Sequence, residues 1–182
     1  MSHVLVLDIG KTHAKALVFD AALNCVHRVQ RASAVVHGAP YPHHDVNRLW
    51  AWMLEAMRDA AARFRIGGLN IAAHGATAAL VDPARGEDGL VLPVLDYEFE
   101  GPALVAGYDS LRPPFAETLS PALPAGLNLG RQLWWQQQCF PAAFARAEAI
   151  LTYPQYWTWR LGGALIGECT SLGCHTDLWA SR

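Results

Sequence analysis

Residues 4–19 read VLVLDIGKTHAKALVF, and this stretch gives the clearest indication of the fold. The apolar run at 4–9 predicts a strand covered on both faces, and the run at 14–19 predicts a second strand. A glycine-containing turn separates the two runs, and the valine-rich residues 25–36 favour a third strand. We therefore predict that this part of the sequence forms a three-stranded meander.

The turn between the first two predicted strands carries residue types suited to a nucleotide phosphate. Gly10 allows the backbone to approach phosphate oxygens, and the Thr12 hydroxyl can donate a hydrogen bond to them. Lys11 and Lys15 can supply positive charge, and Asp8 can hold a magnesium ion, usually through water. The pattern is not a Walker A loop, because it lacks GxxxxGK[ST] and turns between two strands. An ordinary hairpin turn that happens to contain these residue types is the alternative.

A long amphipathic helix is predicted after the meander. Apolar residues recur at steps of three and four from Val46 to Phe64, and Asp45 stands at the position of an N-cap. The glycine pair at 67–68 predicts the end of this helix. Together with the later elements, this order predicts an α/β fold with a mixed five-stranded sheet flanked by helices. The later strands are predicted at 69–73, 77–82, 90–95 and 149–151, and shorter helices at 129–138, 142–148 and 155–161.

The composition is that of a compact globular protein. Hydrophobic residues make up 52% of the chain and charged residues 16%, which is enough apolar material for one domain over residues 1–182. The net charge of −2 gives no electrostatic reason to expect a nucleic acid or an anionic membrane as a partner. The sequence opens without a signal-peptide pattern and has no apolar run long enough to cross a bilayer, so a cytoplasmic location is expected. The four cysteines lack CxxC spacing, and we expect reduced, buried thiols.

Several motifs together resemble one known superfamily. The stretch from Asp8 to Lys15 resembles the first phosphate-binding hairpin of the actin, hexokinase and heat-shock-70 superfamily, written D-[LIV]-G-x-[TS]-x-x-K. Within that superfamily, six further segments resemble the FGGY carbohydrate kinases, in particular xylulokinase-, rhamnulokinase- and fuculokinase-like members. Their order along nearly the whole chain carries the resemblance. The segments are PHHD at 42–45 with LWAW at 49–52, IAAHG at 71–75, LPVLDYE at 92–98, RQLW at 131–134, PQYWTWRLGG at 154–163 and ECTSLGCHTDLW at 168–179.

The resemblance implies a ribonuclease H-like (actin-like ATPase) domain at the amino-terminal side of a sugar kinase. Such an enzyme uses ATP and Mg²⁺ to phosphorylate a hydroxyl of a ketose or related small sugar. In this family an aspartate of a second domain accepts the hydroxyl proton, so the general base is expected beyond Arg182 and this chain alone is expected to be inactive. Asp8 takes the role of metal ligand. The residues that the resemblance assigns to the nucleotide are Asp8, Gly10, Lys11, Thr12 and Lys15.

The same resemblance implies a sugar-binding half-site at His74, Gly75, Asp96 and Glu98. His74 can hydrogen-bond a sugar hydroxyl, although a histidine that only fixes a strand end is the alternative. Asp96 and Glu98 alternate with Tyr97, so on an extended segment both side chains point the same way and can clamp adjacent hydroxyls. A solvated loop is the alternative there. The family's Trp-x-Asp segment reads DYE in this chain, which indicates a divergent subgroup.

Two other functions fit parts of the sequence. A naturally short, non-catalytic relative of these kinases would act as a sugar- or partner-binding module, and the size of the native gene product separates it from a kinase. An acetate-kinase or chaperone-type ATPase of the same superfamily is the third function, and the segments around Asp45 and His74 argue against it. The expected partners are a ketose, ATP, and either a second kinase domain or a second copy of the chain.

Overall fold

The computed structural model describes residues 2–180, which form two compact units. Unit 1 comprises Met1–Val36 and Asp45–His74, and unit 2 comprises His37–His44 and Gly75–Arg182. Each unit is therefore assembled from two separate stretches of the chain, and neither corresponds to one continuous piece of sequence.

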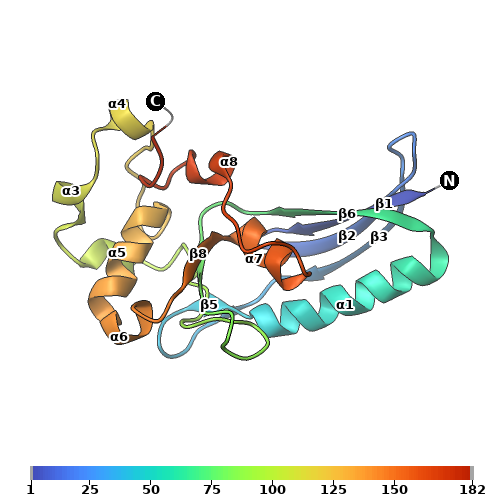
Figure 1. The fold of residues 1–182 in the computed structure, drawn as a ribbon, viewed down its shortest axis with the longest axis horizontal. Coiled ribbons are helices and arrows are strands. Elements are labelled where there is room, and N and C mark those ends of the chain that lie inside the picture. Colours follow the sequence, from blue (N-terminus) through green and yellow to red (C-terminus); the bar gives the residue numbers. More distant parts are fainter. Residues whose placement is uncertain (1, 181–182) are drawn as a thin grey trace. The chain divides into compact units, whose positions relative to one another are not determined.

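Unit 1 is built on a four-stranded sheet in the order β3-β2-β1-β6 (Figure 1). β1, β2 and β3 pair antiparallel, which confirms the predicted meander, and β6 runs parallel to β1, which makes the sheet mixed. Only alternate residues of β1 and β2 are buried, so the prediction that β1 is covered on both faces is wrong. The strands of this unit are β1 (His3–Ile9), β2 (His13–Phe19), β3 (Cys25–Ala32), β4 (Val35–Val36) and β6 (Ile66–Ala73).

Helix α1 (Val46–Arg63) packs against β1 and β2. The Asp45 side chain accepts a hydrogen bond from a backbone amide of the first turn at 3.0 Å, which confirms the predicted N-cap. The predicted helix stop at 67–68 is wrong, because the helix has already ended and both glycines lie in β6. A Cβ at Gly67 would lie 2.6 Å from the Cβ of Ser2, so the glycine serves a close approach between neighbouring segments of the chain.

Unit 2 contains a small sheet of its own. β7 (Ala78–Val81) pairs antiparallel with β8 (Ala149–Thr152), and all four residues of β7 are buried. The predicted strand at 77–82 is therefore confirmed, but it lies outside the main sheet. The predicted strand at 90–95 forms only isolated bridges, because Pro93 lacks the amide that a continuous ladder needs. Among the described residues the main sheet thus has four strands and not the predicted five.

Short helices and aromatic side chains make up most of the rest of unit 2. The helices predicted at 129–138 and 155–161 are confirmed by α5 and α7, and the one predicted at 142–148 shortens to α6. Trp135 packs edge-on against the rings of Tyr41, Phe99 and Phe140 in the core of this unit. The remaining elements are β5 (His43–His44), α2 (Gly101–Leu104), α3 (Tyr108–Leu111), α4 (Phe115–Thr118), α5 (Leu129–Cys139), α6 (Pro141–Phe144), α7 (Tyr153–Arg160) and α8 (Cys169–Leu172).

The four cysteines are free thiols, but all of them are exposed, so the predicted burial is wrong. Cys25 opens β3, Cys139 closes α5 and Cys169 opens α8, while Cys174 follows in a loop. These positions lie at the ends of elements rather than on the faces that pack into a core. Across residues 2–180, no helix combines the length and apolar character that crossing a bilayer requires.

Candidate nucleotide and sugar half-sites

The turn after β1 brings a carboxylate and an ammonium group together in unit 1. Asp8 and Lys15 are direct partners in the antiparallel ladder, and Lys15 Nζ donates to Asp8 Oδ2 at 2.7 Å. The side chains of Asp8 and Lys15 are 34% and 32% exposed, because the buried face of β1 and β2 is formed by the residues directly before and after them in each strand. Both charged groups are therefore fixed by the sheet and still open to a ligand.

Backbone hydrogen bonds hold the turn itself from two sides. Gly10 donates its amide to the carbonyl oxygen of His13 at 3.0 Å, and a Cβ at Gly10 would lie 2.9 Å from that oxygen. Ser33, which the sequence interpretation missed, donates its hydroxyl to the Gly10 carbonyl at 2.8 Å and its amide to the Thr12 carbonyl at 3.0 Å. The Thr12 side chain stays exposed and Lys11 is half-buried. The sequence offered no clear signal for Ser33, because it lies within residues 25–36, which were predicted as one strand, whereas β3 ends at Ala32.

His74 lies beside this turn within the same unit. β6 ends at Ala73, and the His74 amide continues the parallel ladder by donating to the Ile9 carbonyl at 3.1 Å. The carboxyl ends of β1 and β6 therefore meet at one edge of the sheet, where ligands of α/β sheets usually bind. The structure therefore places His74 beside the turn after β1.

Asp96 and Glu98 belong to unit 2 and do not lie on an extended segment. Phe99 donates its amide to the Asp96 carbonyl at 2.9 Å, and the Glu98 amide donates to Asp96 Oδ1 at 3.3 Å. The predicted alternation about Tyr97 is wrong, because an aspartate that accepts the amide two residues ahead stabilises a turn. Asp96 is 6% exposed whereas Glu98 is exposed, so the two carboxylates differ in their access to a ligand. Gly75 is the first residue of the second stretch of this unit.

A second cluster of polar groups in unit 2 had no predicted role. Asp177 accepts hydrogen bonds from Tyr108 Oη at 2.8 Å, from Asn128 Nδ2 at 2.9 Å, and from Arg112 at 2.9 and 3.1 Å. Burial alone would raise the pKa of Asp177, but the bonds from Arg112 and Tyr108 outweigh it and lower this pKa. Because these groups satisfy one another, the cluster ties the segment after α8 to α3 and α5.

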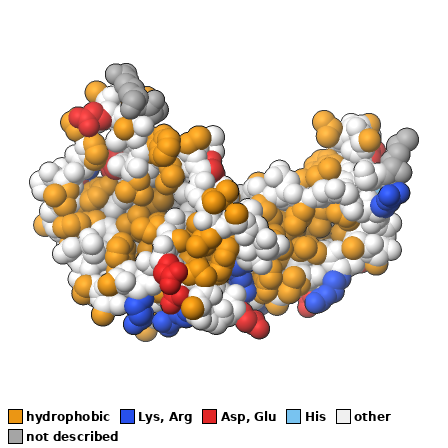
Figure 2. All heavy atoms as spheres, in the orientation of Figure 1, with side chains coloured by type: hydrophobic (Ala, Val, Ile, Leu, Met, Phe, Trp, Pro, Cys, Tyr) orange, Lys and Arg blue, Asp and Glu red, His pale blue; other side chains and the backbone are white. Residues whose placement is uncertain are grey.

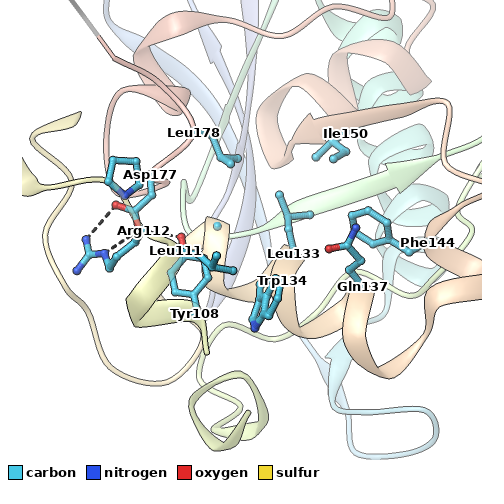
Figure 3. Close-up of a pocket in the computed structure, with 12 residues that line it drawn as sticks. Tyr108, Leu111, Arg112, Leu133, Trp134, Gln137, Phe144, Ile150, Asp177 and Leu178 are labelled. Atoms are coloured by element: carbon cyan, nitrogen blue, oxygen red, sulfur yellow. Dashed lines mark hydrogen bonds and ion pairs between the residues drawn. The ribbon is translucent and has the colours of Figure 1, made fainter. Parts of the chain in front are cut away.

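The same cluster forms one wall of an open pocket of about 440 Å³ (Figure 3). The other walls are mostly apolar and include Leu133, Trp134, Phe144, Ile150 and Leu178. Figure 2 shows hydrophobic side chains over much of the visible surface, with few charges among them. The exposed large apolar residues of unit 2 include Leu104, Leu111, Phe115, Leu119 and Ile166.

The turn after β1 fits a nucleotide with its magnesium ion better than a metal alone. Within residues 2–180 no group of three or more His, Cys, Asp or Glu side chains is placed to hold a metal. Asp8 is a single half-exposed carboxylate, which suits Mg²⁺ that keeps several waters and binds phosphate oxygens. Gly10 spares the turn a Cβ that would lie 2.9 Å from the His13 carbonyl oxygen, and it places no side chain between its backbone and a phosphate.

Comparison with known proteins relates the chain to sugar kinases. A glycerol kinase from Cereibacter sphaeroides is 36% identical over 78 residues, which are 42% of this chain and 16% of that protein. The structure of a carbohydrate kinase from Novosphingobium aromaticivorans is 38% identical with a TM-score of 0.89, over 99% of this chain and 38% of that one. A ligand-bound xylulose kinase from Lactobacillus acidophilus is 14% identical with a TM-score of 0.81, over 100% of this chain and 39% of that one. No protein-family model matches the chain.

The matched kinases are longer than this chain, which spans about two fifths of the two solved structures. The likenesses show a mixed α/β fold shared with sugar kinases of the actin-like ATPase type. They agree with the motifs that run from the turn after β1 to the segment at 168–179.

Proposed function

We propose that this chain is an amino-terminal domain of the FGGY carbohydrate kinase type, and that it supplies the phosphate- and sugar-binding half of an ATP-dependent sugar kinase. The whole enzyme would phosphorylate a hydroxyl of a ketose or related small sugar. The observation that carries the proposal is the position of His74 beside the Asp8–Lys15 turn, at one edge of the unit 1 sheet. The cytoplasm, which supplies ATP, is the proposed location.

The residues of the turn have separate roles in this proposal. ATP with Mg²⁺, when bound, supplies the phosphoryl group. Asp8 would hold the metal, and Lys15, whose Nζ donates to Asp8 Oδ2 at 2.7 Å, would supply positive charge to the phosphate oxygens. Gly10 admits the phosphate to the backbone, while Lys11 and Thr12 add a charge and a hydroxyl donor. Phosphoryl transfer depends mostly on such positioning and charge neutralisation, and a later segment beyond residue 182 would supply the general base.

The sugar contacts are proposed residue by residue. His74 hydrogen-bonds a hydroxyl near the phosphate-type turn, and Gly75 lets the ligand approach the backbone after β6. Glu98, which is exposed, would accept a hydrogen bond from one hydroxyl, and Asp96, which is buried and accepts the Glu98 amide, would accept one from a second hydroxyl. The names of the similar kinases make xylulose and glycerol the first compounds to test.

A non-catalytic sugar- or partner-binding module is the second candidate. Exposed apolar residues such as Leu104 and Phe115 favour a partner that covers them. In the kinase proposal this partner is a second kinase domain. In the binding-module proposal it is a second copy of the chain or another protein. Intact-mass analysis of the native gene product separates the two. A product well over twice 19.9 kDa supports the kinase, and a product of 19.9 kDa supports the module.

The kinase proposal is tested by ADP release from the native gene product with D-xylulose or glycerol and Mg-ATP. Wild type is expected to turn over at least one of them, and Asp8→Asn is expected to lower turnover at least about a hundredfold. Asp20→Asn is the matched control, because Asp20 accepts its hydrogen bonds from Ala22 and Asn24 within the turn between β2 and β3. Equal activity of Asp8→Asn and Asp20→Asn would contradict the assignment of the turn.

A further inference from the structure

Gln132 is a buried polar side chain that bridges two loops of unit 2. It lies on α5, its relative exposure is 1%, and its Nε2 donates to the carbonyl oxygens of Ala76 and Gly126. A primary amide has two N–H groups, so both donors of Gln132 serve backbone acceptors from separate loops. Loss of this amide would leave two buried carbonyl groups without this donor. The free-energy cost of a buried acceptor left unsatisfied exceeds the net stabilisation that a typical hydrogen bond contributes.

The two loops lead to the segments proposed to contact the sugar. Ala76 directly follows Gly75, and its carbonyl is one of the two acceptors. The other acceptor residue, Gly126, donates its amide to the Tyr97 carbonyl at 3.0 Å, and a Cβ at Gly126 would lie 3.0 Å from that oxygen. Gly126 therefore lies flush against the turn at 96–99, and the buried amide connects this turn with the loop after β6.

A second hydrogen bond joins the same two segments directly. Thr77 is fully buried, and its Oγ1 donates to the Leu95 carbonyl at 2.7 Å. Leu95 is also buried and immediately precedes Asp96. Two links, one direct and one through Gln132 and Gly126, thus hold the loop at 75–77 against the start of the turn.

We propose that Gln132 is a positioning residue for the sugar half-site of unit 2. It holds Gly75 and the Asp96 turn at a set separation before a sugar binds, so binding does not have to order them. The inference rests on the proposed function, since a shared sugar ligand is what gives the two segments a common task. The bridge is anchored on a well-formed helix, because Asn128 caps α5 by accepting the Arg131 amide at 3.0 Å.

Amide hydrogen exchange on the full chain tests the bridge without using activity. Gln132→Met keeps the length of the side chain but has no N–H donor, and the Gly126 amide is expected to exchange at least about tenfold faster. Gln136→Met is the matched control, because Gln136 lies one turn further along α5, is 2% exposed and donates to Tyr41 Oη at 2.9 Å. It should leave the Gly126 amide at its wild-type rate. No acceleration in Gln132→Met, or equal acceleration in both variants, overturns the bridge.

Sugar affinity then tests the positioning role. Calorimetric titration of the native gene product with D-xylulose or glycerol is expected to show at least about tenfold weaker binding in Gln132→Met than in Gln136→Met. Affinity for Mg-ATP is expected to be the same in both variants, since a merely structural defect would lower both affinities. Thr77→Val keeps the branched shape and removes the direct link, so it should weaken sugar binding in the same way and replaces Gln132→Met if that variant does not fold.

The outcomes separate this inference from the function on which it rests. Faster Gly126 exchange together with unchanged sugar affinity overturns the positioning role while leaving the kinase proposal intact. A wild-type protein that binds neither D-xylulose nor glycerol refutes the sugar-binding proposal and with it the positioning role. The exchange experiment still decides whether Gln132 holds the two loops together.

Discussion

Replacement of Asp177 by asparagine is expected to destabilise the protein strongly at neutral pH. The Asp177 side chain is 2% exposed and accepts hydrogen bonds from Tyr108, Asn128 and Arg112, whose own side chain is 16% exposed. Removing one charge of a buried ion pair costs roughly 3–5 kcal/mol, because the other charge stays buried without its partner. Asparagine keeps an oxygen acceptor, so we expect a loss near the lower end of that range, about 3 kcal/mol in the free energy of unfolding.

This loss is expected to depend on pH. Hydrogen bonds from Arg112 and Tyr108 outweigh the effect of burial and lower the pKa of Asp177 in the folded state. A carboxylate of this kind stabilises the fold above its ordinary pKa of about 3.9, and the stabilisation is lost as the pH falls through the folded-state value. The difference in unfolding free energy between wild type and Asp177→Asn is therefore full at pH 7 and shrinks below about pH 4.

Urea unfolding followed by tryptophan fluorescence at pH 7 and pH 3 measures both effects. Asp109→Asn is the matched control, because Asp109 also pairs with an arginine, Arg131, but is 76% exposed. An exposed pair of this kind contributes at most about 1 kcal/mol. A loss for Asp177→Asn at pH 7 that is no larger than the loss for Asp109→Asn, or one that does not shrink in acid, would refute the reasoning.

Two further substitutions address the turn after β1 and the start of α1. Gly10→Ala places a Cβ about 2.9 Å from a backbone oxygen, so it should distort the turn. We expect it to lower the free energy of urea unfolding by about 1–3 kcal/mol and to weaken Mg-ATP binding measured by calorimetry. Gly68→Ala is the control, because its Cβ would meet nothing closer than 3.8 Å, and it should leave Mg-ATP binding unchanged. Asp45→Ala removes the N-cap of α1 and should lower the urea-unfolding free energy by about 1 kcal/mol, whereas Asp45→Asn should retain most of the stability.

Local pattern predicted much of unit 1 and less of unit 2. The meander, the cap at Asp45 and the helix at α5 each depend on residues a few positions apart, and all three are confirmed. The predicted strand at 90–95 forms only isolated bridges, because Pro93 has no backbone N–H to donate to a continuous ladder. The predicted extended segment at 96–98 is wrong because the Asp96 side chain accepts a nearby amide and turns the chain, which an alternating pattern does not reveal.

The candidate phosphate site could be predicted from local sequence. Asp8 and Lys15 flank a short turn between two apolar strands, and in a hairpin the turn length sets which residues pair, so their contact follows from local order. Tertiary structure alone decided the bridge from Gln132 to Ala76 and the ion pair of Arg112 with Asp177, whose partners lie 56 and 65 residues apart. Contacts between such distant residues leave no periodicity in the sequence, because they depend on how whole elements pack and not on the spacing within any one of them.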